Sequence, residues 1–287
     1  MQLKETHIVP KLENSIRFQE YAVGIFKIIP TKSGIKKAIK KELIFINGNL
    51  ASTSKYISGN EKIELFQSED TASFKRLELD IEVLFEDDYL AIVFKPSGIL
   101  VSGNKFVTIA NGLCKNLKKS TQYDAVKPQP IHRLDYPTSG VLLIGKTRSS
   151  INTLGEIFKN KEVKKTYFAI TIGKMDTKGI LNFNIDTKNA KTEYEVLKSE
   201  PSKRFEYLNL VKLDPKTGRR HQLRKHLHAI SNPILGDKEY YLKNSILNGK
   251  GMYLHAYSLN FTHPNTKEKI VVHKELPKKF KKIFPDF

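Results

Sequence analysis

The stretch His132-Arg133-Leu134-Asp135-Tyr136-Pro137-Thr138-Ser139-Gly140 leads directly into the apolar run Val141–Ile144. The Pro-Thr-Ser-Gly end of this stretch predicts a turn, because each of these residue types favours turn geometry. The apolar run that follows predicts a buried strand. Asp135 would then lie on a loop that a buried strand holds in place, and rigid scaffolds often present reactive groups in this way.

The same region matches a second motif. Gly140–Thr147 fits the phosphate-loop pattern G-x-x-x-x-G-K-[ST] at every fixed position. A phosphate loop needs a buried strand before it and a bend whose N–H groups converge on phosphates. Here the four middle residues resemble the strand itself, and turn residues precede them. We interpret the match as a coincidence, and nucleotide hydrolysis is an alternative that magnesium-dependent nucleotide binding would reveal.

Two further segments combine polar groups with apolar patterns. Lys165-Thr166-Tyr167 places a phenol on a candidate strand that continues to Ile172. Thr217–Leu227 overlaps a candidate helix that runs from about Arg219 to Ile230. The arginines of this segment could meet a carboxylate or a phosphate.

Metal, thiol and serine chemistries lack the residues they need. The most closely spaced histidines, His221, His226 and His228, suit a single metal poorly, and no carboxylate or thiolate accompanies them. We interpret them as surface or hydrogen-bonded histidines. The single cysteine, Cys114, excludes an internal disulfide and any multi-cysteine metal site. Neither a G-x-S-x-G elbow nor a G-x-G-x-x-G fingerprint occurs in the sequence.

The composition is strongly basic. The chain has 287 residues and a formal net charge of +19, which favours an anionic partner such as nucleic acid. A general lysine-rich composition is the alternative explanation. No apolar run is long enough to cross a bilayer, and Met1–His7 lacks an apolar signal core. We therefore expect a soluble, cytoplasmic protein without membrane association.

A small helix-plus-strand domain is expected at residues 1–75. Ser33 is a candidate N-cap for its helix. Strands at residues 43–46 and 62–66 follow, and the first of them ends at a tight-turn signal, Asn47-Gly48. One side of the helix carries a basic patch made of Lys36, Lys37 and Lys40.

A larger domain is expected at residues 76–287, after a polar linker at residues 67–76. Strands outnumber helices in this region, and strict strand–helix alternation is absent. The predicted fold class is therefore α+β rather than a doubly wound sheet. One of the helices would be capped by Ser149 or Ser150.

The three polar segments resemble those of the RluA family of RNA pseudouridine synthases. The signature H-R-L-D-x-x-T-S-G is present without change as His132–Gly140. The lysine–tyrosine strand of the family resembles Lys165–Tyr167, and its T-G-R-x-H-Q-[LI]-R-x-H-[LM] segment is matched by Thr217–Leu227. The similarity covers about residues 80–275. It departs from the family at Ser102–Asn104, where a histidine–proline pair is usual.

The resemblance implies a pseudouridine synthase fold, with a central mixed, largely antiparallel sheet and a catalytic cleft. It also implies a site-specific isomerisation, in which the glycosidic bond of uridine breaks, the uracil turns, and a ring carbon rejoins the sugar. Nothing is oxidised and no group is imported, so we expect no cofactor and no metal. The implied partner is RNA, with large-subunit ribosomal RNA favoured and transfer RNA left open, and the implied state is a monomer.

By the same resemblance, Asp135 is the essential carboxylate. It either attacks the anomeric carbon or removes a ribose proton to give a glycal, and the sequence does not choose between these routes. Arg224 would pair with Asp135, since an arginine fork keeps a carboxylate ionised. Tyr167 would stack on the flipped uracil and is a candidate for moving the ring-carbon proton, while Arg133 would fill the space that the base leaves. Two further arginines are expected to bind RNA, Arg219 and Arg220.

The small domain resembles the alpha-L type RNA-binding domain. Ser33–Lys41, Ile46–Gly48 and Lys62–Phe66 carry this similarity, although the customary arginine–leucine–aspartate opening is missing. The lysine patch would then contact RNA. The main alternative to a synthase is a non-catalytic RNA-binding or ribosome-assembly protein that keeps the fold. An intact set of three active-site residues argues against it: Asp135, Tyr167 and Arg224.

Overall fold

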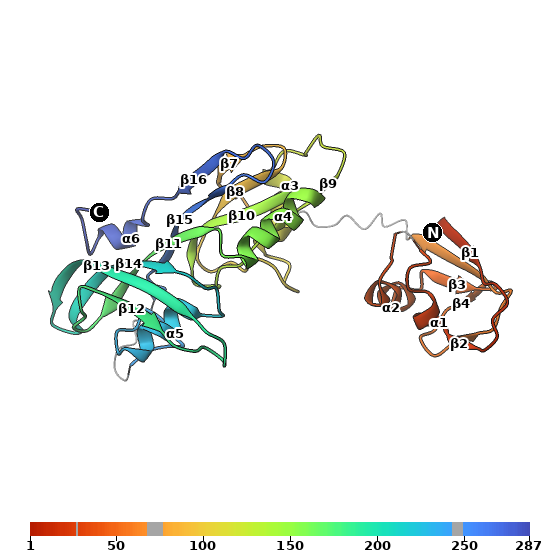
Figure 1. Cartoon of the computed structure of the whole chain (residues 1–287), viewed down its shortest axis with the longest axis horizontal. Coiled ribbons are helices and arrows are strands. Elements are labelled where there is room, and N and C mark those ends of the chain that lie inside the picture. The colour runs from red at the N-terminus through yellow and green to blue at the C-terminus, as the bar shows by residue number, and fades with distance from the viewer. Residues whose placement is uncertain (27, 68–76, 243–248) are drawn as a thin grey trace. The chain divides into compact units, whose positions relative to one another are not determined.

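The computed structural model describes residues 1–26, 28–67, 77–242 and 249–287. These residues belong to two compact units, Met1–Lys75 and Arg76–Phe287, each with its own sheet (Figure 1). The predicted linker at residues 67–76 lies, apart from Gln67, outside the described residues. Within the described part of the chain, no helix has both the length and the apolar character needed to cross a membrane.

The Met1–Lys75 unit is built on a four-stranded sheet with the order β1-β6-β3-β4. Its strands are β1 (Gln2–Ile8), β3 (Ile44–Ile46), β4 (Asn49–Leu50) and β6 (Lys62–Gln67). A two-stranded sheet and two helices complete the unit: β2 (Ile16–Arg17), β5 (Tyr56–Ile57), α1 (Phe18–Tyr21) and α2 (Lys32–Lys40). The predicted turn joins β3 to β4, and both of its residues, Asn47 and Gly48, have positive φ as a tight hairpin requires.

Helix α2 begins earlier than the sequence predicts. Its first residue is Lys32, and its N-cap is Thr31, whose Oγ1 accepts a hydrogen bond from the Gly34 N–H at 3.1 Å. The prediction of Ser33 as the N-cap was therefore wrong, because a threonine two residues upstream supplies the same oxygen. The face of the helix turned away from the core exposes the three predicted lysines, Lys36, Lys37 and Lys40.

The Arg76–Phe287 unit is built on a ten-stranded sheet with the order β12-β13-β14-β11-β15-β10-β8-β7, beside which β16 pairs with β15 and β9 with β10. The strands are β7 (Val83–Glu86), β8 (Leu90–Lys95), β9 (Ala125–Pro130), β10 (Ser139–Thr147), β11 (Lys164–Ile172), β12 (Lys178–Asn182), β13 (Lys191–Ser202), β14 (Glu206–Pro215), β15 (Leu254–Thr262) and β16 (Lys269–His273). β10 and β15 run parallel, and the other named pairs are antiparallel. The predicted mixed, largely antiparallel sheet is confirmed.

Helices accompany both halves of this sheet. They are α3 (Ile109–Asn116), α4 (Arg148–Lys159), α5 (Gln222–Ala229) and α6 (Lys278–Lys281). One hydrophobic core joins β8 and β10 to α3 and α4, and a second joins β11 and β14 to α5 and α6. The cavity described below lies where residues from both halves meet.

Two helix starts differ from the sequence prediction. The N-cap of α4 is Thr147, whose hydroxyl accepts a hydrogen bond from the Ser150 N–H at 3.1 Å, so neither Ser149 nor Ser150 is the cap. Helix α5 begins at Gln222 and not near Arg219. The residue before Gln222 has a left-handed backbone, which a right-handed helix cannot include.

The phosphate-loop motif lies inside a strand. Every residue of β10, from Ser139 to Thr147, is buried, so Gly140–Thr147 has no open loop that could surround a phosphate. The motif lysine, Lys146, is 2% exposed and its Nζ lies 2.7 Å from Glu86 Oε1. The interpretation of this motif as a strand is confirmed.

Strand β15 brings two of the predicted segments together. Gly140 of β10 and Tyr167 of β11 both pair with Ala256 of β15, from its two edges. Gly140 has a φ of 133°, and a Cβ on it would lie 2.2 Å from the Ala256 carbonyl oxygen. Only glycine allows the strands to approach this closely. The loop that carries Asp135 is thereby held beside the strand that carries Tyr167.

Candidate active site

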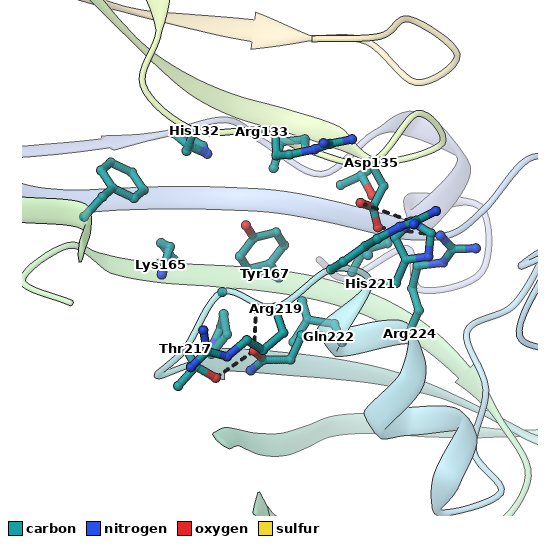
Figure 2. A pocket seen from close by; sticks show the side chains of 18 of the residues that line it. His132, Arg133, Asp135, Lys165, Tyr167, Thr217, Arg219, His221, Gln222 and Arg224 are labelled. Carbon is teal, nitrogen blue, oxygen red and sulfur yellow. Dashed lines mark hydrogen bonds and ion pairs between the residues drawn. The ribbon is translucent and has the colours of Figure 1, made fainter. Parts of the chain in front are cut away.

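A cavity of about 590 Å³ collects all three polar segments of the larger unit. It is lined by the loop between β9 and β10, by the start of β11, and by the loop between β14 and α5 (Figure 2). The predicted residues of this unit all line it: Arg133, Asp135, Tyr167, Arg219, Arg220 and Arg224. The predicted lysines of α2 belong to the other unit, where they line a separate shallow pocket with Lys32 and Ser33.

A buried lysine holds the loop that carries Asp135. The Lys95 Nζ donates to the backbone carbonyls of Thr138 at 2.7 Å, Pro96 at 2.9 Å and Tyr136 at 3.3 Å. Burial lowers the pKa of Lys95 to about 8, although the nearby Asp135 charge acts in the opposite direction. The turn after β8 adds a further bond, from the Gly98 N–H to the Tyr136 carbonyl at 2.8 Å. The backbone that follows Asp135 is therefore fixed before any substrate binds.

Asp135 is the only carboxylate among the described residues that line the cavity. Its Oδ2 lies 3.6 Å from Arg224 Nη1, and its Oδ1 lies 3.7 Å from His221 Nε2. Its side chain is 21% exposed, so both solvent and a ligand can reach it. The cavity lining also carries seven positive side chains: Arg133, Lys159, Lys161, Lys165, Arg219, Arg220 and Arg224. The cavity suits an anionic ligand that brings a neutral group to the carboxylate.

Arg224 is buried and makes its strongest contacts away from the cavity. Its Nε and Nη2 donate to the two oxygens of Asp237 at 2.6 and 2.7 Å, and Nη2 also reaches Glu239 Oε2 at 3.1 Å. Burial lowers the pKa of Arg224, but Asp237 outweighs this effect, so the net shift is upward. The predicted pairing with Asp135 is present as one contact, while the guanidinium fork itself lies on Asp237. Asp237 is not among the site residues that the sequence predicted.

The backbone before α5 is fixed by one buried amide. Gln222 Oε1 accepts hydrogen bonds from the Thr217 hydroxyl at 2.7 Å and the Arg219 N–H at 3.0 Å. Its Nε2 donates to the Lys191 carbonyl and to Thr192 Oγ1, both at 3.0 Å. These four bonds use both donors and both lone pairs of the amide. They tie the arginine-rich loop to strand β13.

Tyr167 points into the cavity from β11 (Figure 2). The register between β11 and β15 shifts here because β15 has an extra residue, Tyr257, between the partners of Thr166 and Tyr167. Burial raises the pKa of the Tyr167 phenol, and the Asp135 charge adds to this effect. The phenol is therefore neutral at ordinary pH and offers an apolar ring face and a hydroxyl donor.

Two residues at the other end of the cavity, His132 and Lys165, were not predicted from the sequence as site residues. His132 Nε2 accepts a hydrogen bond from the Leu143 N–H at 3.1 Å, and its ring stacks on Phe158 with a centroid distance of 4.7 Å. Burial, aided by the Lys165 charge, lowers the pKa of His132 to about 3. Burial also lowers the pKa of Lys165, whose Nζ lies 5.8 Å from the centre of the Phe158 ring. Lys165 shares a strand face with Tyr167, and this alternation was the available signal.

His221 is the third residue that sequence reasoning missed. The interpretation as a surface or hydrogen-bonded histidine overlooked its place in the cavity lining beside Asp135. Its φ of 55° turns the chain just before α5 and directs the ring inward. No spacing rule shows such a conformation, which costs roughly 1–2 kcal/mol for a residue with a side chain. Of the other two histidines, His226 is buried with Nδ1 3.0 Å from Thr192 Oγ1.

Comparison with known proteins agrees with this geometry. Residues 89–229 match the family model described as RNA pseudouridylate synthase. An uncharacterized RNA pseudouridine synthase from Aquifex aeolicus is 31% identical over 283 residues, which cover 88% of each chain. A ribosomal large subunit pseudouridine synthase C from Buchnera aphidicola is 31% identical over 318 residues, which cover 98% of each chain. A solved structure of human RNA pseudouridylate synthase domain containing 4 has a TM-score of 0.56 at 27% identity, over 69% of this chain and 90% of that one.

A mixed sheet that presents a single carboxylate inside a cationic cavity, together with these likenesses, defines an RNA-modifying isomerase. The chain belongs to the RNA pseudouridine synthase family, and its motifs place it with the RluA type. The resemblance that the three sequence segments predicted is confirmed. No observation favours the alternatives of a nucleotide hydrolase or a non-catalytic RNA-binding protein.

Proposed function

We propose that this enzyme isomerises one or more specific uridines in large-subunit ribosomal RNA, with Asp135 as the reacting carboxylate. The observation that carries the role of Asp135 is its position in the cavity: among the described lining residues it is the single carboxylate, and the other charged side chains are cations. The choice of ribosomal RNA rests on relatives named ribosomal large subunit pseudouridine synthase C or D, which match over most of their length. Transfer RNA is the alternative substrate.

Asp135 acts at the sugar in this proposal. Either its carboxylate attacks the anomeric carbon as the glycosidic bond breaks, or it removes a ribose proton and a glycal forms. In both cases the carboxylate must be ionised. Arg224 Nη1 and His221 Nε2 lie 3.6 and 3.7 Å from its two oxygens. The uracil then turns within the cavity and rejoins the sugar through a ring carbon, which must give up its proton.

Tyr167 binds the flipped base, and Arg133 fills the space that the base leaves in the RNA. The neutral phenol of Tyr167 offers a face on which the uracil stacks, beside Asp135. As a base for the ring-carbon proton, Tyr167 would first have to transfer its own proton, because its pKa is raised. Arg133 is exposed at the cavity edge and would enter the RNA stack where the base leaves. Extrusion of a base costs a few kcal/mol, and contacts from Arg219 and Arg220 to phosphates offset that cost.

The Met1–Lys75 unit serves as an RNA-binding domain in this proposal. Its exposed helix face carries lysines without interleaved acidic residues, as a phosphate-contacting surface requires. The patch consists of Lys36, Lys37 and Lys40. A cytoplasmic location and a monomeric state belong to the same proposal.

The substrate is tested by mapping. Pseudouridines are located by chemical labelling in total RNA from cells that lack the protein, and again after wild-type protein or Asp135→Ala is supplied. We expect a large-subunit ribosomal site that only the wild type restores. Restoration of a transfer RNA site would replace the proposed substrate, and equal restoration by Asp135→Ala would overturn the catalytic role of Asp135.

A further inference from the structure

Each carboxylate oxygen of Asp135 has a side-chain nitrogen close to it. Arg224 Nη1 lies 3.6 Å from Oδ2, and His221 Nε2 lies 3.7 Å from Oδ1. His221 and Arg224 are three residues apart at the start of α5, so one rigid helix end supplies both contacts. A carboxylate held at only one oxygen can rotate, whereas a contact at each oxygen fixes its plane.

The other ring nitrogen of His221, Nδ1, also contacts neighbouring side chains. Its Nδ1 lies 3.1 Å from the Tyr240 hydroxyl and 3.3 Å from Glu239 Oε1, and the Tyr240 ring meets it edge to face at a centroid distance of 5.7 Å. Glu239 also contacts Arg224, and Tyr240 lies over the Arg224 guanidinium at 4.8 Å. Glu239 and Tyr240 therefore support both residues that face Asp135.

The segment that supplies these supports is in turn anchored on Asp237. Asp237 Oδ1 accepts hydrogen bonds from the Glu239 N–H at 2.9 Å and the Tyr240 N–H at 3.1 Å. The same carboxylate accepts the Arg224 fork. Although burial favours its neutral form, the pKa of Glu239 is lowered by Tyr240, His221 and Arg224. The negative charge that faces Nδ1 of His221 is thus retained.

The backbone at His221 gives an independent indication. His221 is the N-cap of α5 with φ 55° and ψ 27°, and its side chain makes no capping hydrogen bond. Serine, aspartate or asparagine is the usual cap, and glycine or asparagine suits a left-handed backbone best. A residue that violates both local preferences while its ring faces a reactive group fits the pattern of strain stored at functional sites.

We infer that His221 is a positioning residue that fixes the orientation of the Asp135 carboxylate, and that Glu239 and Tyr240 orient His221 for this task. The inference rests on the proposed role of Asp135. His221 itself transfers no atom to or from the substrate. Its loss is expected to slow the chemical step while RNA binding and folding stay intact.

His221→Gly is the decisive variant, because glycine removes the imidazole and also relieves the left-handed backbone. Ser231→Gly is the matched control: Ser231 follows the other end of α5, has a φ of 62°, and does not line the cavity. The assay uses RNA labelled with tritium at uracil C5, isolated from cells that lack the protein, since isomerisation releases this hydrogen to water. Melting temperature and RNA dissociation constants are measured in parallel.

We expect His221→Gly to lower kcat about 10- to 100-fold, as loss of a contact to a charged group does, with the dissociation constant for RNA within about twofold of wild type. Added imidazole should restore part of kcat in His221→Gly and leave Ser231→Gly unchanged. A kcat within about twofold of wild type, or a loss that lies entirely in RNA binding, would overturn the positioning role. If Asp135→Asn were as active as wild type, the proposed function of Asp135 would fail, whatever His221→Gly does.

Discussion

Arg224 directs its guanidinium fork at Asp237, with Nε–Oδ2 and Nη2–Oδ1 distances of 2.6 and 2.7 Å, and reaches Asp135 with its remaining nitrogen at 3.6 Å. The arginine is thus fixed by a carboxylate that is itself fully buried. Its position beside Asp135 does not depend on Asp135. The site is organised before substrate arrives, which is the condition under which fixed charges contribute most to a reaction.

Asp237→Asn tests this arrangement. The substitution keeps the shape but leaves a buried arginine without its main partner, so we expect the free energy of unfolding to fall by about 3 kcal/mol. We also expect kcat to fall more than tenfold, because Arg224 can swing toward Asp135 or Glu239. Urea unfolding and tritium release measure the two effects. Asp186→Asn is the control, and it should change neither the free energy of unfolding nor kcat. It removes an exposed ion-pair partner of Lys225, which lies on α5 next to Arg224.

Gly140→Ala should disrupt the contact between β10 and β15. Its Cβ would lie 2.2 Å from the Ala256 carbonyl oxygen at a φ of 133°. We expect the free energy of unfolding to fall by about 2–3 kcal/mol. We also expect activity to fall by more than this loss of stability alone would cause, because the Asp135 loop moves. Gly155→Ala in α4, with nothing within 4 Å of its Cβ, should instead gain up to about 1 kcal/mol. Equal stabilities for the two variants would contradict the close approach.

The buried His255 should make stability depend on acid pH. Burial lowers its pKa from the usual 6.5 to about 4, while Nδ1 lies 2.9 Å from the Ser139 hydroxyl and Nε2 2.9 Å from the Lys274 carbonyl. Below pH 6.5, His255 is protonated in the unfolded chain but stays neutral in the folded chain. The free energy of unfolding therefore falls as the pH falls toward 4. Between pH 7 and about pH 5, His255 should lower it by ~2 kcal/mol.

Urea unfolding at both pH values checks this effect in wild type and in His255→Gln. The glutamine variant should be less stable at neutral pH but should lose less on acidification. The exposed His273 provides the control as His273→Gln, which should keep the wild-type pH dependence. Identical pH dependence in His255→Gln and wild type would show that another group is responsible.

Tyr167→Phe separates stacking from proton chemistry. Phenylalanine keeps the ring, so the dissociation constant for RNA should stay within about twofold, whereas Tyr167→Leu should lose about 1 kcal/mol or more of binding. Because burial raises the pKa of Tyr167 above its usual 10, no phenolate forms near neutral pH. The ratio of wild-type to Tyr167→Phe rates should therefore be constant from about pH 6.5 to 9. A ratio that grows steadily with pH would assign a phenolate base instead.

The lysine face of α2 is tested by salt dependence. Replacement of Lys36, Lys37 and Lys40 with glutamine should weaken RNA binding and reduce the slope of log K against log salt by about 2–3. The corresponding triple arginine variant keeps the charge and should bind as wild type does. Turnover at saturating RNA should be the same in all three proteins. An unchanged slope in the glutamine variant would remove this face from the RNA-binding surface.

The sequence predicted the strand that contains Val141–Ile144 and the strand that carries Tyr167, because their signals are local. It did not predict four other strands: β1, β9, β12 and β16. The apolar run before Lys146 could only be a buried strand, and the order of the three motifs identified the family. Helix starts were less accurate, since several hydroxyl residues compete as caps and only the backbone decides between Thr147 and Ser150.

The supports of the site could not be predicted in the same way. His221 depends on a left-handed backbone, and Lys95 acts through carbonyls some 40 residues further along the chain. Asp237 and Glu239 reach Arg224 only after α5 has folded back on the segment that follows it. The periodicity and spacing of residues in a sequence do not predict such long-range contacts.

Asp135→Asn measures whether Asp135 is the reacting carboxylate that we propose. Purified wild type and variant are compared in tritium release from uracil C5, with RNA binding and melting temperature as controls for folding. We expect no turnover by Asp135→Asn above background, with RNA binding within about twofold of wild type. Turnover by a folded Asp135→Asn enzyme within about tenfold of wild type would contradict it.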